Sequence, residues 1–186
     1  MGGHRFKPEK ASKLLDPKRY ELLQPEKMVR EFGIQKEDMV ADLGAGNGFF
    51  TLPMALYAKK VFAVDIEPKM LELLKERASE QGIENVQLIE SDLDHIRLED
   101  DSVDKALAAF VLHEVPNLER TLTEIKRILK PNGTLLIIEW EAVESEMGPP
   151  IHERIASDVL AAKAKEHGFT VEMIHPHPSF YVLVAK

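Results

Sequence analysis

The sequence contains no cysteine. This absence excludes disulfide bonds, thiolate nucleophiles, iron–sulfur clusters and cysteine-ligated zinc. Any chemistry must come from oxygen and nitrogen side chains or from a cofactor. The remaining metal-ligand types are poorly arranged, because His152 and Glu153 lie far along the chain from His175 and His177, and His-Pro-His-Pro is typical of a turn. We expect no metal site.

Long apolar runs are also missing. No stretch reaches the roughly 18 apolar residues of a membrane-spanning helix, and the basic start MGGHRFKPEKASKL lacks the apolar segment of a secretory signal. We expect a cytoplasmic chain that does not insert into membranes. With 186 residues and 44% hydrophobic content, residues 1–186 are expected to form one domain. In it, residues 1–38 form a helical lead-in or lid and residues 39–186 form the core.

Positive charge is scarce overall but concentrated at one end. The net charge of −8 argues against nucleic acid as a partner, because phosphate binding requires clustered Lys and Arg. Residues 1–30 nevertheless carry eight Lys and Arg against four Asp and Glu, which leaves a net −12 for residues 31–186. This basic segment, which includes Phe6 and Tyr20, fits a lid, a contact for an anionic substrate, or a solvated helix face.

Short apolar runs alternate with helical patterns after residue 38. Such runs are typical of strands that are covered on both faces. They are MVADL (39–43), VFAVDI (61–66), VQLIES (86–91), ALAAFVL (106–112) and TLLIIEW (134–140). Strands that alternate with helices predict parallel pairing through right-handed crossovers, and hence an open, doubly wound α/β sheet.

Candidate helices lie between the apolar runs. One begins at Pro68, repeats apolar residues at helical spacing (Met70, Leu71, Leu74, Ala78) and stops at Gly82. Another carries an apolar stripe (Leu118, Leu122, Ile125, Leu129) and breaks at residues 130–133, which read Lys-Pro-Asn-Gly. A third is predicted over residues 151–167, with Ile151, Ile155 and Val159 on one face and a stop at Gly168.

The C-terminal segment departs from this alternation. TVEMIH (170–175) and FYVLVA (180–185) are separated by a Pro-rich turn over residues 175–178, which is too short for a crossover helix. These two strands must therefore pair antiparallel. The complete prediction is a Rossmann-like, seven-stranded, mostly parallel sheet with an antiparallel C-terminal hairpin.

A glycine-rich loop follows the first predicted strand in the segment ADLGAGNGFF (41–50). Open α/β sheets bind ligands at this edge, and glycines let a ligand approach the backbone closely. The spacing G-A-G-N-G differs from the dinucleotide pattern G-x-G-x-x-G. Asp42 would repel a pyrophosphate but suits an ammonium or sulfonium group, unless it only caps the next helix. Phe49 and Phe50 are expected in the core of that helix.

Two further carboxylates follow the second and third predicted strands. Asp65 ends VFAVD, where a carboxylate can accept both hydroxyls of a ribose. Asp92 follows the third strand at the same edge, where it can bind an adenine amino group while Ile66 and Leu93 enclose the ring. Acidic residues at three successive strand ends are a specific arrangement, although any one of them also fits a solubilising role in a βα turn.

Together these segments resemble the successive motifs of class I S-adenosylmethionine-dependent methyltransferases. The motifs are D-L-G-A-G-N-G, V-D-I-E-P, S-D-L-D, A-A-F-V-L-H-E and L-K-P-N-G-T-L-L-I-I-E-W, within residues 38–140. They look most like the type 11, ubiquinone/menaquinone-biosynthesis-like branch. The sequence differs from the quinone enzymes at His113-Glu114, and it lacks the cysteines of the arsenite methyltransferases.

This resemblance implies S-adenosylmethionine as cofactor and S-adenosylhomocysteine as product. It implies that the loop faces the methionine part, that Asp42 lies near the amino group, and that the two later carboxylates hold ribose and adenine. Phe110 would lie close to the reacting methyl group. The implied cofactor-binding residues are Asp42, Gly44, Ala45, Gly46, Gly48, Asp65, Ile66, Asp92, Leu93 and Phe110.

The expected reaction is in-line methyl transfer to a small-molecule acceptor, which needs positioning more than covalent catalysis. His113 is interpreted as a general base or acceptor-orienting group, or else as a structural residue that caps the next helix. Trp140 either lines the acceptor pocket or packs under the following helix. Two other functions fit less well: an NAD-dependent oxidoreductase of related fold, and a non-catalytic partner protein that binds S-adenosylmethionine.

Overall fold

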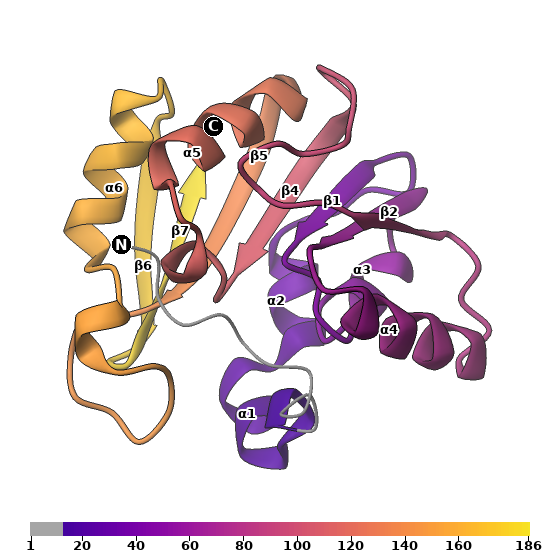
Figure 1. Cartoon of the computed structure of the whole chain (residues 1–186), viewed down its shortest axis with the longest axis horizontal. Helices are drawn as coiled ribbons and strands as arrows, with labels where there is room; N and C mark the ends of the chain where they lie inside the picture. Colours follow the sequence, from indigo (N-terminus) through magenta and orange to yellow (C-terminus); the bar gives the residue numbers. More distant parts are fainter. Residues whose placement is uncertain (1–12) are drawn as a thin grey trace.

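The computed structural model describes residues 13–186, which form a seven-stranded sheet with helices on both faces (Figure 1). The strand order is β3-β2-β1-β4-β5-β7-β6. The strands are β1 (Met39–Leu43), β2 (Lys60–Asp65), β3 (Val86–Glu90), β4 (Val103–Ala109), β5 (Leu129–Trp140), β6 (Val171–His177) and β7 (Phe180–Ala185). Strands β1 to β5 pair in parallel, whereas β7 is antiparallel to both β5 and β6. The predicted fold class and C-terminal hairpin are confirmed.

The order of the strands creates a crevice between β1 and β4. From β1 the chain adds β2 and β3 toward one edge, and it then returns to place β4 on the other side of β1. Connections on the two sides of this point leave in opposite directions, so the carboxyl ends of β1 and β4 border an opening. The glycine loop directly follows β1 at this position.

Helical segments flank the strands, and a further short 3-10 turn covers residues 13–15. The helical segments are α1 (Pro17–Leu23), α2 (Pro25–Glu31), α3 (Thr51–Ala55), α4 (Pro68–Glu80), η2 (Leu112–Glu114), α5 (Leu118–Ile128), η3 (Ile151–Glu153) and α6 (Ser157–Glu166). In α4 the four apolar residues predicted to share a face are the four buried ones, and Pro68 occupies its first turn. The α5 stripe is confirmed at Leu122 and Ile125, but Leu129 already belongs to β5.

The predicted helix over residues 151–167 is wrong in its first half. The short η3 turn is followed by extended backbone at Arg154 and Ala156, and α6 begins only at Ser157. The Arg154 side chain binds the carbonyl oxygens of Pro149, Val143 and other residues of the preceding loop, which fixes this segment outside a helix. Ile151 therefore lies outside the helix and is exposed, and Val159, although it lies in α6, is exposed as well, because Leu160 and Ala164 form the buried face of that helix.

Other boundaries also differ from the prediction. Strand β5 starts at Leu129 and includes residues 130–133, which were expected to form a turn. Strand β6 continues through His177, so the hairpin turn is confined to residues 178–179. The connection between β3 and β4, residues 91–102, contains no helix and packs Leu93 and Ile96 against the core.

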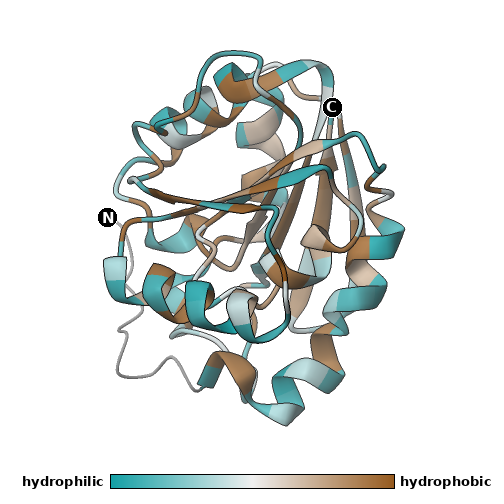
Figure 2. Cartoon of the chain, turned by 90° about the vertical axis from the view of Figure 1, so that its right-hand side faces the viewer, coloured by the Kyte–Doolittle hydropathy of each residue, from teal (hydrophilic) through white to brown (hydrophobic). Residues whose placement is uncertain are grey.

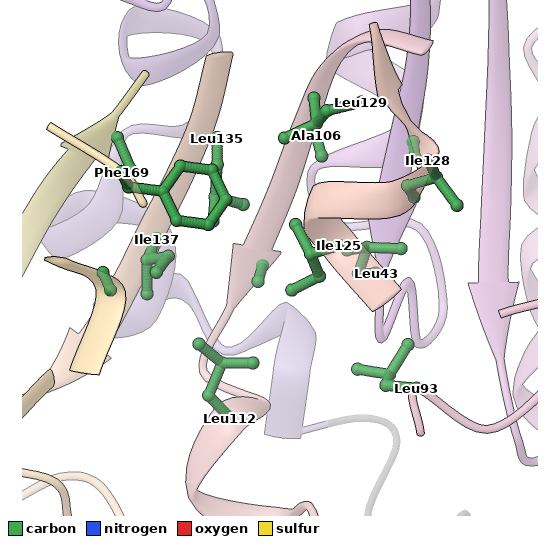
Figure 3. Packing of buried hydrophobic residues seen from close by; sticks show 14 of the residues in the cluster. Leu43, Leu93, Ala106, Leu112, Ile125, Ile128, Leu129, Leu135, Ile137 and Phe169 are labelled. Atoms are coloured by element: carbon green, nitrogen blue, oxygen red, sulfur yellow. The ribbon is translucent and has the colours of Figure 1, made fainter. Parts of the chain in front are cut away.

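Residues of β5 show how the core divides between the two faces of the sheet. Successive strand side chains point to opposite faces. Leu135 and Ile137 join the cluster under α5 and α6, whereas Leu136 and Ile138 join the cluster under α2 and α3. Figure 3 shows part of the first cluster, with Ile125 from α5 among strand residues. Figure 2 shows the apolar colour gathered in the strands and the polar colour on the outer turns of the helices.

Within residues 13–186, no helix combines the length and the apolar character that crossing a membrane requires.

Candidate functional site

A cavity of about 720 Å³ lies at the carboxyl ends of the strands. The helix α1 and the loop after β5 lie beyond the ends toward which β4 and β5 point (Figure 1). Ten of the eleven predicted site residues line this cavity: Asp42, Gly44, Ala45, Gly46, Asp65, Ile66, Asp92, Leu93, Phe110 and His113. We call the lining residues at and just after the carboxyl ends of β1, β2 and β3 the β1–β3 side, and those at and just after the carboxyl ends of β4 and β5 the β4–β5 side. The structure thus brings the dispersed motifs together around one space.

The glycine loop packs tightly against the end of β4. Gly44 has a φ of +76°, and a Cβ added there would lie 2.5 Å from Cγ2 of Val111. Its N–H and that of Ala45 donate to the carbonyl oxygen of Val64, which fixes the loop to β2. Gly48, the remaining predicted residue, does not line the cavity. A Cβ there would lie 3.0 Å from Cγ of Leu74, so Gly48 allows α4 to pack closely against the loop.

Asp42 is a buried acid at the end of β1. Its side chain accepts a 2.5 Å hydrogen bond from the Thr51 hydroxyl. Burial raises the pKa of Asp42 to about 7, with the Thr51 hydrogen bond opposing the shift and the charge of Asp65 adding to it. The N-cap of α3 is Phe50, so Asp42 does not cap that helix. A cationic ligand beside Asp42 would stabilise its carboxylate form.

Asp65 is held in a fixed orientation by two backbone groups. Its Oδ2 accepts from Gly46 N–H at 2.7 Å, and its Oδ1 accepts from Glu67 N–H at 2.9 Å. Burial raises the pKa of Asp65, and these hydrogen bonds oppose the shift. The carboxylate therefore ties the glycine loop to the end of β2. Each of its oxygens keeps a further lone pair for a hydroxyl donor.

Asp92 lies at the more open end of the β1–β3 side. It is exposed, and its Oδ1 accepts from the backbone N–H of His95 at 2.8 Å. Ile66 is 37% exposed and Leu93 is 7% exposed, and both line the same cavity. The arrangement offers apolar surface beside a carboxylate, which suits a flat ring that carries an amino group.

His113 is the titratable residue at the centre of the β4–β5 side. It lies in η2 and is buried, and its Nδ1 is 2.9 Å from Oε2 of Glu139. Burial lowers the pKa of His113, but the charge and hydrogen bond of Glu139, together with Glu114 and Glu153, outweigh this and raise it. The cap of α5 is Asn117, whose side chain accepts from Arg120 N–H, so His113 does not cap that helix.

Glu139 is a residue whose role the sequence did not reveal. It is completely buried at the end of β5. Its carboxylate accepts backbone N–H groups from Leu112, His113 and Trp140, in addition to the imidazole of His113. One side chain therefore fixes both the η2 turn and the ring of His113. An acidic residue within a strongly apolar strand is the signal that could have identified it.

Phe110 connects β4 to η2 in an unusual backbone conformation. Its φ is +55°, which is rare for a bulky residue and is often found at functional sites. The ring centroid lies 4.6 Å from that of Trp140. Trp140 is 4% exposed and lines the cavity, as one of the two predictions had it, and it packs in the core cluster under α2 and α3 instead of under the following helix α6. Phe49 and Phe50 lie in the same core cluster, as predicted.

The N-terminal segment contributes a third part of the lining. Lys13, Leu14, Asp16 and Arg19 line the cavity, and the Arg19 guanidinium lies over the ring of Phe110. Tyr20, named in the lid prediction, is 46% exposed. Phe6, named with it, lies outside the described residues. The sequence did not single out Arg19, because it is one of eight basic residues in the first thirty.

Residues 13–186 contain no group of three or more His, Asp or Glu side chains that could hold a metal ion.

A family profile, a solved structure and two curated proteins that match this chain are named as methyltransferases. A family profile described as "Methyltransferase domain" matches residues 41–137. The crystal structure of a SAM dependent methyltransferase from Aquifex aeolicus is 32% identical, with a TM-score of 0.91, and the match covers 97% of this chain and 98% of that one. The YcgJ structure from Bacillus subtilis is 23% identical, covers 81% and 70% of the two chains, and has a TM-score of 0.73, which shows similarity of fold.

Matched curated proteins are longer than this chain. The ubiquinone/menaquinone biosynthesis C-methyltransferase UbiE of a Marinomonas species is 26% identical over 161 residues, covering 81% of this chain and 64% of its own length. The uncharacterized methyltransferase YcgJ of Bacillus subtilis is 28% identical over 117 residues, covering 63% of this chain and 46% of its own length. The chain thus spans about half to two thirds of these relatives.

Proposed function

The chain belongs to the type 11 branch of the class I S-adenosylmethionine-dependent methyltransferases, and from this premise we propose that it methylates a small-molecule acceptor by in-line displacement. The observation that carries the proposal is one cavity with two chemically different sides. The β1–β3 side presents a bare backbone loop and three carboxylates, and the β4–β5 side presents an oriented imidazole.

The residues of the β1–β3 side fit the cofactor of this family. Asp65, held by backbone N–H groups, is oriented to accept ribose hydroxyls. Asp92, with Ile66 and Leu93 beside it, would hold the adenine. Asp42 would face the ammonium group and the glycine loop the methionine chain. When bound, S-adenosylmethionine supplies a methyl group already activated by its sulfonium charge.

His113 acts on the acceptor in this proposal. Because Glu139 binds Nδ1, Nε2 is the nitrogen left to face an acceptor, and it lies 3.7 Å from Oε1 of Glu114. A hydroxyl, amine or acidic carbon that loses a proton on methylation could transfer it to Nε2. Because the pKa of His113 is raised, its imidazole stays protonated to higher pH, and the neutral form that can accept a proton predominates only above this pKa. The methyl-transfer rate should therefore rise with pH through this pKa.

The proposed function is tested in two steps. Calorimetry should show binding of S-adenosylhomocysteine and none of NAD; the opposite result would identify an oxidoreductase. Labelled methyl is then followed from S-adenosylmethionine into a fractionated metabolite extract. Cofactor binding without transfer to any fraction would indicate a non-catalytic partner protein.

His113 is tested once an acceptor is known. His113→Gln should lower kcat by roughly 10²- to 10⁴-fold and remove the alkaline rise of the rate. The cofactor affinity should remain unchanged, since this substitution does not alter the β1–β3 side. Wild-type turnover in this variant would exclude His113 from proton transfer.

A further inference from the structure

Arg19 is a half-buried cation that has no anionic partner among residues 13–186. Within residues 13–186, its Nε is shielded from solvent and has no hydrogen-bond partner, and the guanidinium forms no salt bridge. Burial lowers the pKa of Arg19 to about 10, and no carboxylate offsets this shift. Burying an unpaired guanidinium is costly, so the arrangement is explained most simply if a ligand supplies the missing anion.

Two aromatic rings hold this guanidinium in place. Its central carbon lies 5.1 Å from the ring centroid of Phe49 and 5.1 Å from that of Phe110. The rings contact the planar group through cation–π interactions and leave its N–H edge for an acceptor. Arg19 also lines the cavity. A carboxylate matches the edge of a guanidinium in a two-pronged hydrogen bond.

The position of Arg19 indicates which part of a ligand it meets. Phe49 directly follows the glycine loop and Phe110 directly follows β4, so both rings border the crevice between β1 and β4. Leu14, from the same segment as Arg19, would lie 3.4 Å from a Cβ added at Gly46. This is the loop expected to face the methionine chain. Asp65 and Asp92, which are expected to hold ribose and adenine, follow the more distant strands β2 and β3.

We propose that Arg19 binds the carboxylate of the cofactor's methionine part and thereby fastens α1 over the cavity. This inference rests on the proposed function only in taking S-adenosylmethionine as the ligand. It assigns a recognition role to the basic N-terminal segment and explains why a half-buried cation lies against two phenylalanine rings. It also makes the order of α1 dependent on the carboxyl group of the ligand.

The test compares two ligands that differ only in the carboxyl group: S-adenosylhomocysteine and its decarboxylated analogue. Calorimetry on the wild type should show a preference of roughly 10- to 100-fold for S-adenosylhomocysteine. Arg19→Met keeps the apolar stem and should abolish this preference by weakening S-adenosylhomocysteine alone. Arg19→Lys keeps the charge but not the planar fork and should retain part of the preference.

Lys18→Met is the matched control, because Lys18 is exposed on the same helix and does not line the cavity. It should leave the preference unchanged. Hydrogen exchange gives a second readout: S-adenosylhomocysteine should slow exchange in Pro17–Leu23 more than the decarboxylated analogue does.

Two results would overturn the inference, and they differ from failure of the proposed function. One is an Arg19→Met protein that binds S-adenosylhomocysteine with its full preference, and the other is equal protection of α1 by both ligands. In both cases S-adenosylhomocysteine still binds and the proposed function stands. Absence of binding to the wild type would instead contradict the proposed function itself. If Arg19→Met does not fold, the Arg19→Lys protein decides by the size of its remaining preference.

Discussion

The two sides of the cavity are built by different means. On the β1–β3 side, each carboxylate comes at or just after the end of its own strand, and backbone N–H groups hold two of them. On the β4–β5 side, the central imidazole is held by Glu139, a residue 26 positions away in the sequence. The first side therefore depends on hydrogen bonds to backbone N–H groups, two of them local and one from the glycine loop to Asp65, whereas the second depends on a long-range contact between two side chains.

Removing the long-range contact should have the largest effect. Glu139→Ala leaves several buried donors without an acceptor and should destabilise the protein by about 3–5 kcal/mol. Urea unfolding measures this change. Glu144→Ala, an exposed position in the following loop, is the control and should change stability by less than about 0.5 kcal/mol.

The cost of Glu139→Ala should also depend on pH. The folded-state pKa of His113 is raised, so its stabilising contribution is complete below the unfolded value of about 6.5 and is lost as pH rises through the folded value. The difference between wild type and variant should therefore shrink in alkaline buffer. A difference that does not change with pH would show that Glu139 acts only through the backbone of η2.

Disturbing the local geometry of the β1–β3 side should have the next largest effect. Gly44→Ala combines a strained positive φ with a clash against Val111 and should destabilise the protein by about 2–4 kcal/mol. It should also weaken binding of S-adenosylhomocysteine. Gly82→Ala is the matched control, since Gly82 has a φ of +66° and nothing within 4 Å of an added Cβ. That variant should lose only about 1 kcal/mol and bind normally.

The smallest expected effect concerns the charge of Asp42. Its folded-state pKa of about 7 lies above the unfolded value. The protonated Asp42 side chain therefore contributes fully to the free energy of unfolding below about pH 4, and this contribution is lost as pH rises through 7. The Asp42→Asn side chain does not ionise, so the variant keeps this contribution at high pH. Between pH 4 and pH 8, its free energy of unfolding should rise by about 1–3 kcal/mol relative to that of the wild type. Denaturation at both pH values tests the expectation.

Asp42 should also link ligand binding to proton release. An ammonium group beside Asp42 favours its carboxylate, so binding near pH 6 should release a proton from the wild type and none from Asp42→Asn. Calorimetry in two buffers of different ionisation enthalpy measures the released proton. Equal release from both proteins would place the ammonium group away from Asp42.

The contrast between the two sides also explains what the sequence could predict. Asp65 and Asp92 each follow a recognisable strand, and parallel strands end at the same edge, so local patterns were enough to place them together. The contact between Glu139 and His113 depends on the pairing of β4 with β5 and on the backbone turn at Phe110, which no local pattern encodes. Gly48 shows the limit of motif reading, because in one glycine pattern Gly46 lines the cavity whereas Gly48 allows α4 to pack against the loop.

The antiparallel hairpin determines when this site can be completed during synthesis. Strand β7 is synthesised after the other six strands, yet it inserts between β5 and β6 and places Phe180 against the ring of Phe110. The strands of the β1–β3 side emerge early and can pair with one another, whereas β5 lacks a neighbour on its outer edge until β7 has been synthesised. A nascent chain therefore completes the side proposed to hold the nucleoside before the side proposed to act on the acceptor.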